Sequence, residues 1–301
     1  MTMIEEINAL KKEKNAVILA HYYVRPEVQA IADYVGDSFY LSKIAVNLKE
    51  DTIVFCGVSF MGESAKILNP NKKVLMPDMN ADCAMAHMAD KKTIEMMRKK
   101  YDDLAVVCYI NSTAELKTYS DVCVTSANAI KIVKALPNKN IFFIPDRNLA
   151  YYISTLVPEK KFVFNDGYCP VHAQIQTEQI KKVKEKHPEA LVLTHPECTE
   201  AVVAMSDYIG STSGIIKYAT ESHEKEFIIC TEEGVCYELE QKNPDKKFYF
   251  TESRPVCHDM KAITLDKILH VLQTGENEVQ VSDTLRTQSK MPLERMLELG
   301  K

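Results

Sequence analysis

The sequence has no tryptophan, only 9 glycines in 301 residues, and no long apolar run. Neither GxGxxG nor GxxxxGK[ST] occurs, which argues against a dinucleotide-binding loop or a P-loop. No apolar stretch approaches the roughly 20 residues that a membrane-spanning helix needs. Residues 1–15 have the pattern of an amphipathic helix and not that of a signal peptide. These absences predict a soluble, cytoplasmic protein that does not act at a membrane.

The sequence also has no excess of positive charge, and its cysteines lack the CxxC spacing of zinc-binding motifs. The net charge is −5 and the isoelectric point is near 6.0, so nucleic acid is not an expected partner. None of the 9 cysteines stands in a CxxC pair, so a zinc ribbon or a thioredoxin-like site is not supported. A disulfide scaffold is not expected in a chain of this size without an export signal.

What the sequence does contain is one pattern written three times, in residues 18–39, 106–128 and 191–214. In each copy an apolar run ends at a polar residue; an aspartate follows 12 residues later, a hydroxyl residue 5 further on, a proline 32 beyond that, and then a strand and a cysteine. Such a fixed period predicts a threefold internal repeat. The members are His21, Asp33, Ser38, Pro70 and Cys83; Tyr109, Asp121, Ser126, Pro158 and Cys169; and His195, Asp207, Thr212, Pro244 and Cys257.

Within each copy, apolar strands alternate with helical patterns, which is typical of parallel βαβ units. In the first copy we predict strands at 16–20, 52–57 and 73–76, and helices at 26–34, 38–49 and 61–68. A helix at 264–273 matches those that open each copy and should pack back on the first. The predicted fold class is α/β: three pseudo-threefold-related three-layer α/β/α domains with small parallel sheets around a central active site. The predicted domains are 1–86 with 259–301, 87–172, and 173–258.

The polar positions of the repeat fall at strand ends, where parallel α/β sheets bind ligands. Cys83, Cys169 and Cys257 lie in loops rich in Gly, Asp, Asn and Pro, which are poor places to bury a thiol. Three converging thiolates would hold a [4Fe–4S] cluster with one open iron, a Lewis acid. A zinc ion on the same three cysteines stays possible. The other six cysteines are expected to be small buried hydrophobes.

Further candidates surround the same expected cavity. Hydroxyls at predicted helix starts (Ser38, Ser126, Ser211, Thr212) favour an anionic substrate. Three histidines, His21, His172 and His195, stand next to the cavity by position. Glu197 is the candidate general base, and Tyr23 and Tyr109 are candidate proton carriers or orienting donors. We interpret Asp33, Asp121 and Asp207 as structural helix caps.

The motifs HYY, GDS, YINSTAELK, TSANA, PDRNL, GYCPVH, HPEC, GSTSG, TEEG and CHDMK together resemble those of the quinolinate synthase family, over about residues 4–272. The length and the start of the sequence resemble the shorter type of that family. The resemblance implies three domains around a [4Fe–4S] cluster held by Cys83, Cys169 and Cys257. It also implies condensation of iminosuccinate with dihydroxyacetone phosphate to quinolinate, with loss of phosphate and water, in NAD biosynthesis. A functional link to an L-aspartate oxidase or dehydrogenase follows.

Position by position, the resemblance places catalytic roles on Tyr23, Glu197, His195 and His21. A regulatory disulfide beside Cys257 is not expected, because cysteines that some relatives carry nearby are absent. Other readings remain: the diphthamide-synthesis enzymes and the diphosphate reductase of isoprenoid synthesis have a similar layout, and the metal could be structural in a non-catalytic binding module. The implied substrate contacts are His21, Ser38, Tyr109, Asn111, Ser126, His172, His195, Glu197, Ser211 and Thr212.

Overall fold

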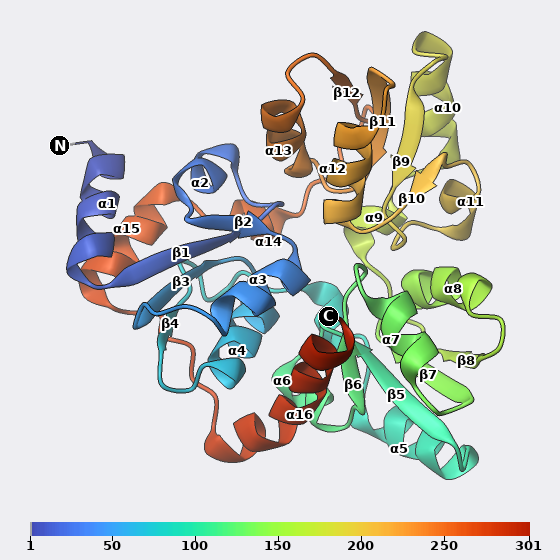
Figure 1. Cartoon of the computed structure of the whole chain (residues 1–301), viewed down its shortest axis with the longest axis horizontal. Helices are drawn as coiled ribbons and strands as arrows, with labels where there is room; N and C mark the ends of the chain where they lie inside the picture. Colours follow the sequence, from blue (N-terminus) through green and yellow to red (C-terminus); the bar gives the residue numbers. More distant parts are fainter. Residues whose placement is uncertain (1) are drawn as a thin grey trace.

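Three four-stranded sheets, all parallel, organise the chain in the computed structural model, which describes residues 2–301 (Figure 1). Each sheet has the same order, with the first strand between the second and third and the fourth at the edge. This confirms the predicted α/β fold class. The first unit holds β1 (Ala16–His21), β2 (Tyr34–Gly36), β3 (Thr52–Cys56) and β4 (Lys73–Leu75); the second β5 (Leu104–Tyr109), β6 (Val122–Val124), β7 (Asn140–Ile144) and β8 (Lys161–Phe164); the third β9 (Leu191–Thr194), β10 (Tyr208–Ile209), β11 (Glu226–Cys230) and β12 (Lys247–Tyr249).

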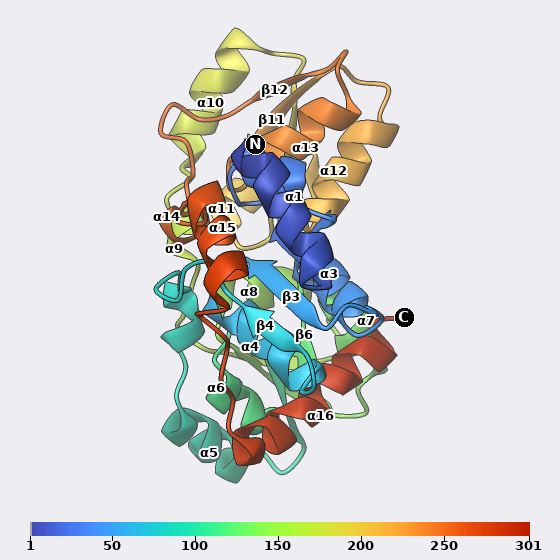
Figure 2. The ribbon, with the colours of Figure 1, turned by 90° about the vertical axis from the view of Figure 1, so that its left-hand side faces the viewer.

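Helices connect the strands and lie on the faces of the sheets (Figures 1 and 2). Their cover explains why β1 and β5 are buried along their whole length and are apolar up to their last residues, His21 and Tyr109. The first unit has α1 (Met3–Glu13), α2 (Pro26–Ile31), α3 (Ser38–Ala45), α4 (Ser59–Leu68) and the 3₁₀ turn η1 (Ala84–His87); the second α5 (Lys91–Lys100), α6 (Ala114–Thr118), α7 (Ala129–Ala135), α8 (Arg147–Leu156) and α9 (Pro170–Ala173); the third α10 (Thr177–Lys186), α11 (Glu200–Val203), α12 (Thr212–Glu221), α13 (Val235–Lys242) and α14 (His258–Lys261); α15 (Leu265–Thr274) and α16 (Asp283–Leu299) end the chain.

The three repeat aspartates bind strands and not helices, so the predicted helix-cap role was wrong. Each carboxylate accepts the backbone N–H of a residue in the central strand, and each aspartate backbone N–H donates to the carbonyl of that same residue. The aspartates therefore fasten the turn before each short edge strand to the sheet. The pairs are Asp33 with Ile18, Asp121 with Val106 and Asp207 with Val192, with N···Oδ2 distances of 2.7, 2.6 and 2.7 Å.

Two parts of the sequence fold differently from the expectation. The helix expected over 26–34 ends at Ile31, and Tyr34 begins the edge strand β2. One hydroxyl also misses the helix start expected for it: α7 begins at Ala129, three residues after Ser126, whereas Ser38 is the first residue of α3, as predicted. The Asp37 side chain caps α3 by accepting Tyr40 N–H, whereas Asn128 at the N-cap of α7 makes no side-chain capping bond.

The C-terminal region packs against the first and second units. As expected, α15 lies against α1. The last helix, α16, was not anticipated; it carries Pro292 inside and packs on α4 of the first unit and on α6, β6 and α7 of the second (Figure 2). It therefore ties these two units together. The domain boundaries given above stay a prediction.

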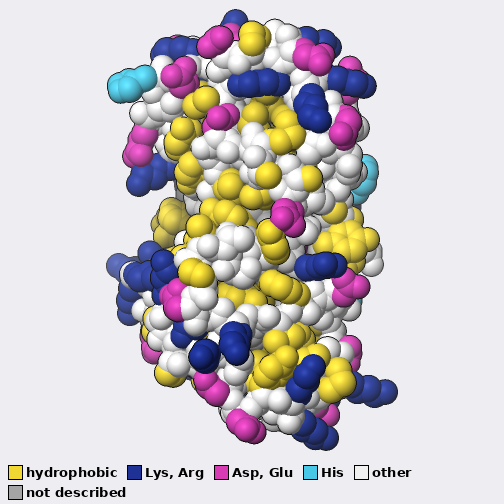
Figure 3. All heavy atoms as spheres, turned by 90° about the vertical axis from the view of Figure 1, so that its right-hand side faces the viewer, with side chains coloured by type: hydrophobic (Ala, Val, Ile, Leu, Met, Phe, Trp, Pro, Cys, Tyr) yellow, Lys and Arg dark blue, Asp and Glu magenta, His cyan; other side chains and the backbone are white. Residues whose placement is uncertain are grey.

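The surface mixes the two signs of charge. On the face that carries α8 and α11, lysine and arginine side chains are interspersed with aspartate and glutamate, and apolar side chains lie between them (Figure 3). Among residues 2–301, none of the helices has the length and apolar character that a bilayer crossing requires.

Candidate active site

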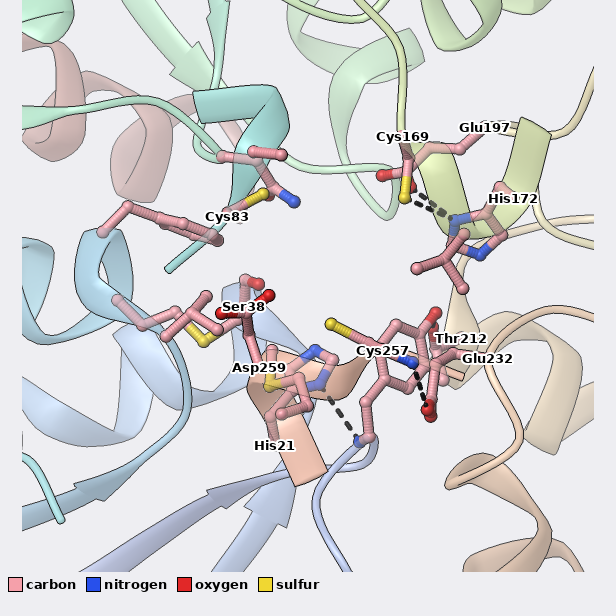
Figure 4. Close-up of a pocket in the computed structure, with 18 of the residues that line it drawn as sticks. His21, Ser38, Cys83, Cys169, His172, Glu197, Thr212, Glu232, Cys257 and Asp259 are labelled. Carbon is pink, nitrogen blue, oxygen red and sulfur yellow. Dashed lines mark hydrogen bonds and ion pairs between the residues drawn. The ribbon is translucent and has the colours of Figure 1, made fainter. Parts of the chain in front are cut away.

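A cavity of about 290 Å³ lies where the carboxyl ends of the three sheets meet, lined by residues of all three units (Figure 4). Parallel strands of one sheet deliver their last side chains to the same edge, and the threefold arrangement turns the three edges toward one another. One predicted residue is missing from the lining: Ser211 caps α12, with its Oγ accepting Gly214 N–H at 3.1 Å. The predicted residues that line the cavity are His21, Tyr23, Ser38, Cys83, Tyr109, Asn111, Ser126, Cys169, His172, His195, Glu197, Thr212 and Cys257.

The three repeat cysteines reach the cavity in the same way. Each of Cys83, Cys169 and Cys257 directly precedes a short helical turn, η1, α9 or α14. Their sulfur atoms point into one space from three sides (Figure 4). Burial raises the pKa of Cys83 to about 12 and that of Cys257 to about 11, while the backbone N–H groups at the start of each turn favour the thiolate. Binding a cation there would release the protons that burial retains.

The spacing of the three cysteines fits a multi-iron cluster better than one ion bound by all three sulfurs. Within residues 2–301, one group of three possible ligand atoms lies within 4.8 Å of one another, and its residues are Cys169, His172 and Glu197. The sulfur atoms of Cys83, Cys169 and Cys257 do not form such a group. Two sulfurs on one zinc ion lie at most about 4.6 Å apart, because each Zn–S bond is about 2.3 Å. Cys257 is nevertheless near enough to raise the pKa of Cys83. Three soft thiolates that are spaced too widely for one shared zinc ion suit an iron–sulfur cluster.

The remaining cysteines behave largely as expected. Cys56, Cys108, Cys123, Cys198 and Cys230 are buried in the core. Cys236 is half-buried on α13, where its sulfur faces Glu240 Oε1 at 3.3 Å.

A continuous chain of hydrogen bonds runs along one wall of the cavity. His172 Nδ1 lies 2.8 Å from Glu197 Oε2 and Nε2 lies 2.9 Å from Thr231 Oγ1. Thr231 Oγ1 is 2.8 Å from the Tyr23 hydroxyl, which is 2.7 Å from Thr212 Oγ1. With Glu197 ionised, His172 Nδ1–H donates to it, and Nε2 accepts the Thr231 hydroxyl proton. Tyr23 then donates to Thr231 and accepts from Thr212.

Glu197 is the charged end of this chain and is almost completely buried. Burial alone would raise its pKa, but the electrostatic interaction with the nearby rings of His172 and His195, with hydrogen bonds from His172 and Tyr109, lowers its pKa to about 2. The Tyr109 hydroxyl donates to Glu197 Oε1 at 2.5 Å. In contrast, burial and the charge of Glu197 raise the pKa of Tyr23 well above its ordinary value. At neutral pH the site therefore holds one carboxylate and a neutral phenol at opposite ends of the chain.

The two repeat-equivalent histidines are both neutral. Burial lowers the pKa of His21 and of His195 to about 3. His21 Nδ1 accepts Tyr23 N–H at 3.2 Å and His195 Nδ1 accepts Glu197 N–H at 3.4 Å, so both rings carry their proton on Nε2. His195 Nε2 lies 3.2 Å from Ser126 Oγ. Neutral imidazoles of this tautomer donate a hydrogen bond to a ligand without adding charge.

Several important residues were not singled out from the sequence. Thr231 and Glu232 follow β11 and are fully buried, and Glu232 pairs with Lys261 at 2.8 Å. Asp146 follows β7, is fully buried, and caps α8 through Leu149 N–H at 2.6 Å. Asp146 and Glu232 are 86 residues apart, as are Tyr109 and His195, so the repeat register could have found the acidic pair.

Comparison with known proteins gives a consistent result. Residues 5–298 match the family model described as quinolinate synthetase A protein. A quinolinate synthase of Fusobacterium nucleatum subsp. nucleatum is 54% identical over 298 residues, 99% of each chain. One of Clostridioides difficile is 52% identical over 295 residues, 98% of this chain and 97% of its own, and one of Clostridium perfringens is 48% identical over 300 residues, 100% of each. The diphthamide, diphosphate-reductase and binding-module readings find no support here.

Proposed function

The chain belongs to the quinolinate synthase family, and from this premise we propose that its central cavity condenses iminosuccinate with dihydroxyacetone phosphate to quinolinate, releasing phosphate and water. The observation that carries the proposal is the pairing of three cavity cysteines, one from each unit, with a buried hydrogen-bonded chain from Glu197 to Tyr23. An aspartate-oxidising enzyme, an L-aspartate oxidase or dehydrogenase, would supply iminosuccinate. The cytoplasm is the proposed location.

Cys83, Cys169 and Cys257 would hold a [4Fe–4S] cluster, which three thiolates leave with one open iron able to polarise a substrate oxygen and assist loss of hydroxide. Each cysteine also faces backbone N–H groups of the turn that follows it. Such N–H groups stabilise negative charge on sulfur without adding a titratable group. The spacing of the three cysteines supports this assignment over one zinc ion bound by all three sulfurs.

Substrate carboxylates and phosphate would meet polar groups that lack protein partners. Asn111 Oδ1 and Thr125 Oγ1 are buried, line the cavity and find no hydrogen-bond partner within residues 2–301. Unsatisfied buried polar atoms are rare in native proteins, and a bound ligand would satisfy them. Ser38, Ser126 and Thr212 add hydroxyl donors on the other sides. The neutral Nε2–H groups of His21 and His195 would orient substrate oxygens, with Tyr109 beside them.

Proton transfer would follow the hydrogen-bonded chain. When Tyr23 gives its proton to Thr231, the Thr231 proton passes to His172 Nε2 and the His172 Nδ1 proton passes to Glu197. The reverse sequence returns a proton from Glu197 to Tyr23. Glu197 thus acts as a general base at a distance, and Tyr23 is the group that exchanges a proton with the substrate. Thr231, His172 and Glu197 are buried, which limits the loss of the proton from the chain to bulk water.

The direct test is an anaerobic assay with protein reconstituted with iron and sulfide. We expect quinolinate to form only when iminosuccinate, dihydroxyacetone phosphate and cluster-loaded protein are all present. Quinolinate formation at equal rate by metal-free protein, or none by fully loaded protein, would contradict the proposal.

A further inference from the structure

Glu232 is a buried carboxylate that none of the proposed proton-transfer steps uses. Its side chain is fully buried, and both of its oxygens are occupied. Oε1 accepts the backbone N–H of Cys257 at 3.0 Å (Figure 4). Oε2 accepts the backbone N–H of Gly234 at 2.6 Å. A carboxylate of the third unit therefore fixes the backbone of a proposed cluster ligand.

Lys261 completes this site from the other side. Its ammonium lies 2.8 Å from Glu232 Oε1 and donates to the backbone carbonyl of Tyr23 at 2.6 Å. Its side chain is only 14% exposed, so the pair is shielded from water and salt. The one ion pair thus contacts the backbone of Cys257 and the backbone of Tyr23, which belong to different units.

The surroundings leave little room for the pair to move. A Cβ atom at Gly234 would lie 2.8 Å from Glu232 Oε2, from Lys261 Nζ and from the Tyr22 carbonyl oxygen. Gln29 Nε2 donates to the carbonyls of Gly234 and Tyr22 at 3.0 and 2.8 Å, which holds the same two backbones together. Such crowding fixes the positions of both charged groups.

A carboxylate also faces the backbone of each of the other two cysteines, but neither carboxylate belongs to a buried ion pair. Cys83 N–H donates to the neighbouring Asp82 Oδ1 at 2.8 Å, and the Asp82 side chain is 43% exposed. Asp146, at the repeat position of Glu232, is buried and hydrogen-bonds the backbone of Cys169, but it has no ion pair in residues 2–301. In this described part of the chain, Cys257 alone has its N–H held by a buried ion pair.

We propose that the Glu232–Lys261 pair is a positioning unit that fixes the cluster ligand Cys257 and the proton carrier Tyr23 relative to each other. The proposal rests on the proposed function for the roles of Cys257 and Tyr23. Neither Glu232 nor Lys261 exchanges a proton with the substrate. Both act through the backbones that they hold.

The test uses the full-length protein reconstituted with iron and sulfide, and compares wild type with Glu232→Gln and Lys261→Met. The first readout is the rate at which an iron chelator removes the cluster, which requires no turnover. We expect this rate to rise about 10- to 100-fold in both variants, as for other groups that orient metal ligands. The second readout is quinolinate formation, in which kcat should fall about 10-fold or more while KM stays within about threefold.

Controls separate positioning from a general loss of stability. Glu233→Gln changes the neighbouring carboxylate, which faces Arg254 at 3.6 Å and does not contact Cys257, and should match wild type within about twofold in both readouts. Lys261→Arg keeps the positive charge, so its rate of iron release should stay closer to that of the wild type than to that of Lys261→Met. If Lys261→Met does not fold, Glu232→Gln and Lys261→Arg decide the question.

Iron release and kcat within about twofold of wild type in Glu232→Gln would overturn the proposal. A failure of the proposed function looks different: the wild type would then hold its cluster and make no quinolinate, while the chelator readout would still distinguish the variants from Glu233→Gln.

Discussion

The first and third units share one plan but place different residues at the end of their third strand. Both have the same strand order, the same aspartate–strand contact and a cysteine before a short helical turn. After β3 the chain continues with Gly57–Val58, whereas after β11 it continues with Thr231–Glu232. Val58, with Phe60 and Met61, gives an apolar wall of the cavity. Thr231 and Glu232 give the hydrogen-bonded chain and the ion pair.

This difference shows which properties the repeat supplies and which it does not. The backbone plan brings equivalent positions to one cavity, so under the proposed function the three cysteines serve the same purpose. The side chains at the strand ends would then divide the chemistry, with proton transfer on the third unit and its contact with Tyr23, and apolar packing on the first. The predictions below test where the units are equivalent and where they are not.

The largest effect should come from the cysteines, where the comparison predicts equality. Replacing Cys83, Cys169 or Cys257 singly by Ser removes one soft ligand, so each variant should lose its cluster and at least about 1,000-fold of its activity. Iron and sulfide analysis with the anaerobic assay measures both. Cys236→Ser is the control and should keep both. If one of the three variants retained full cluster content, the three units would not be equivalent.

The next largest effect should come from Glu197, which stands two residues after His195 as Tyr23 stands two after His21. Glu197→Gln leaves the cysteines untouched but removes the proton acceptor, so kcat should fall about 100- to 10,000-fold with iron content unchanged. Steady-state kinetics and iron analysis on one preparation give the answer. Near-normal turnover would exclude Glu197 as the base.

Substitutions at Thr231 in the third unit and at Val58 in the first test whether the two cavity walls have different roles. Thr231→Val interrupts the chain between Tyr23 and His172 and should lower kcat about 10- to 100-fold. Val58→Thr places a hydroxyl in the apolar wall and should instead cost about 1–3 kcal/mol of unfolding free energy with kcat little changed. Kinetics and chemical denaturation of both variants measure the contrast. Equal kinetic losses in both would remove the distinction between the walls.

Acid sensitivity should be shared by the first and third units, because His21 and His195 are both held neutral. Each has a folded pKa of about 3 against an ordinary value of 6.5, so the unfolded state binds protons first as the pH falls. As the pH falls from 6.5 to 3, each histidine should therefore lower the free energy of unfolding by about 1.4 kcal/mol per pH unit. Glu197 adds a loss of the same sign below pH 4.5.

Urea unfolding of the apoprotein from pH 7 to pH 4 tests this. Either His21→Asn or His195→Asn should flatten the pH dependence relative to wild type, and the exposed His223→Asn should not. An unchanged slope in both variants would show that these histidines do not charge on unfolding.

The smallest effect should come from the aspartates that fasten each edge turn. Asp33→Ala, Asp121→Ala and Asp207→Ala each leave a strand N–H without its acceptor and should cost about 1–3 kcal/mol. The strand contact is the same in all three units, and the ion pairs of Asp33 with Lys11 and of Asp121 with Arg98 are partly exposed, so the losses should agree within about 1 kcal/mol. Thermal unfolding measures them. A large loss of turnover in one stable variant would indicate a role beyond the fold.

Much of this arrangement could be predicted, because the repeat fixes positions relative to one another. The parallel units, and the gathering of Cys83, Cys169 and Cys257 at one cavity, follow from a period that apolar strands and loop residues both obey. The edge strands β2, β6 and β10 span only two or three residues, too few for an alternation to show. Helix α16 was missed because Pro292 lies inside it, where proline normally argues against a helix.

The partners of the site residues could not be predicted, for a different reason. Thr231 bridges Tyr23 and His172, which lie 208 and 59 residues away, and Lys261 reaches a carbonyl 238 residues away. Such contacts depend on how the units turn toward one another, which no local pattern records. The aspartates show the same limit: their position in the repeat was evident, but their partner in the neighbouring strand was not.

The central claim is that three units each contribute one thiolate to a single cluster. The most direct measurement is the iron and acid-labile sulfide content of anaerobically reconstituted protein, with the EPR spectrum of its reduced form. We predict about four irons and four sulfides per chain and the signal of one reduced [4Fe–4S] cluster. A colourless protein with about one zinc per chain and no sulfide would contradict the claim.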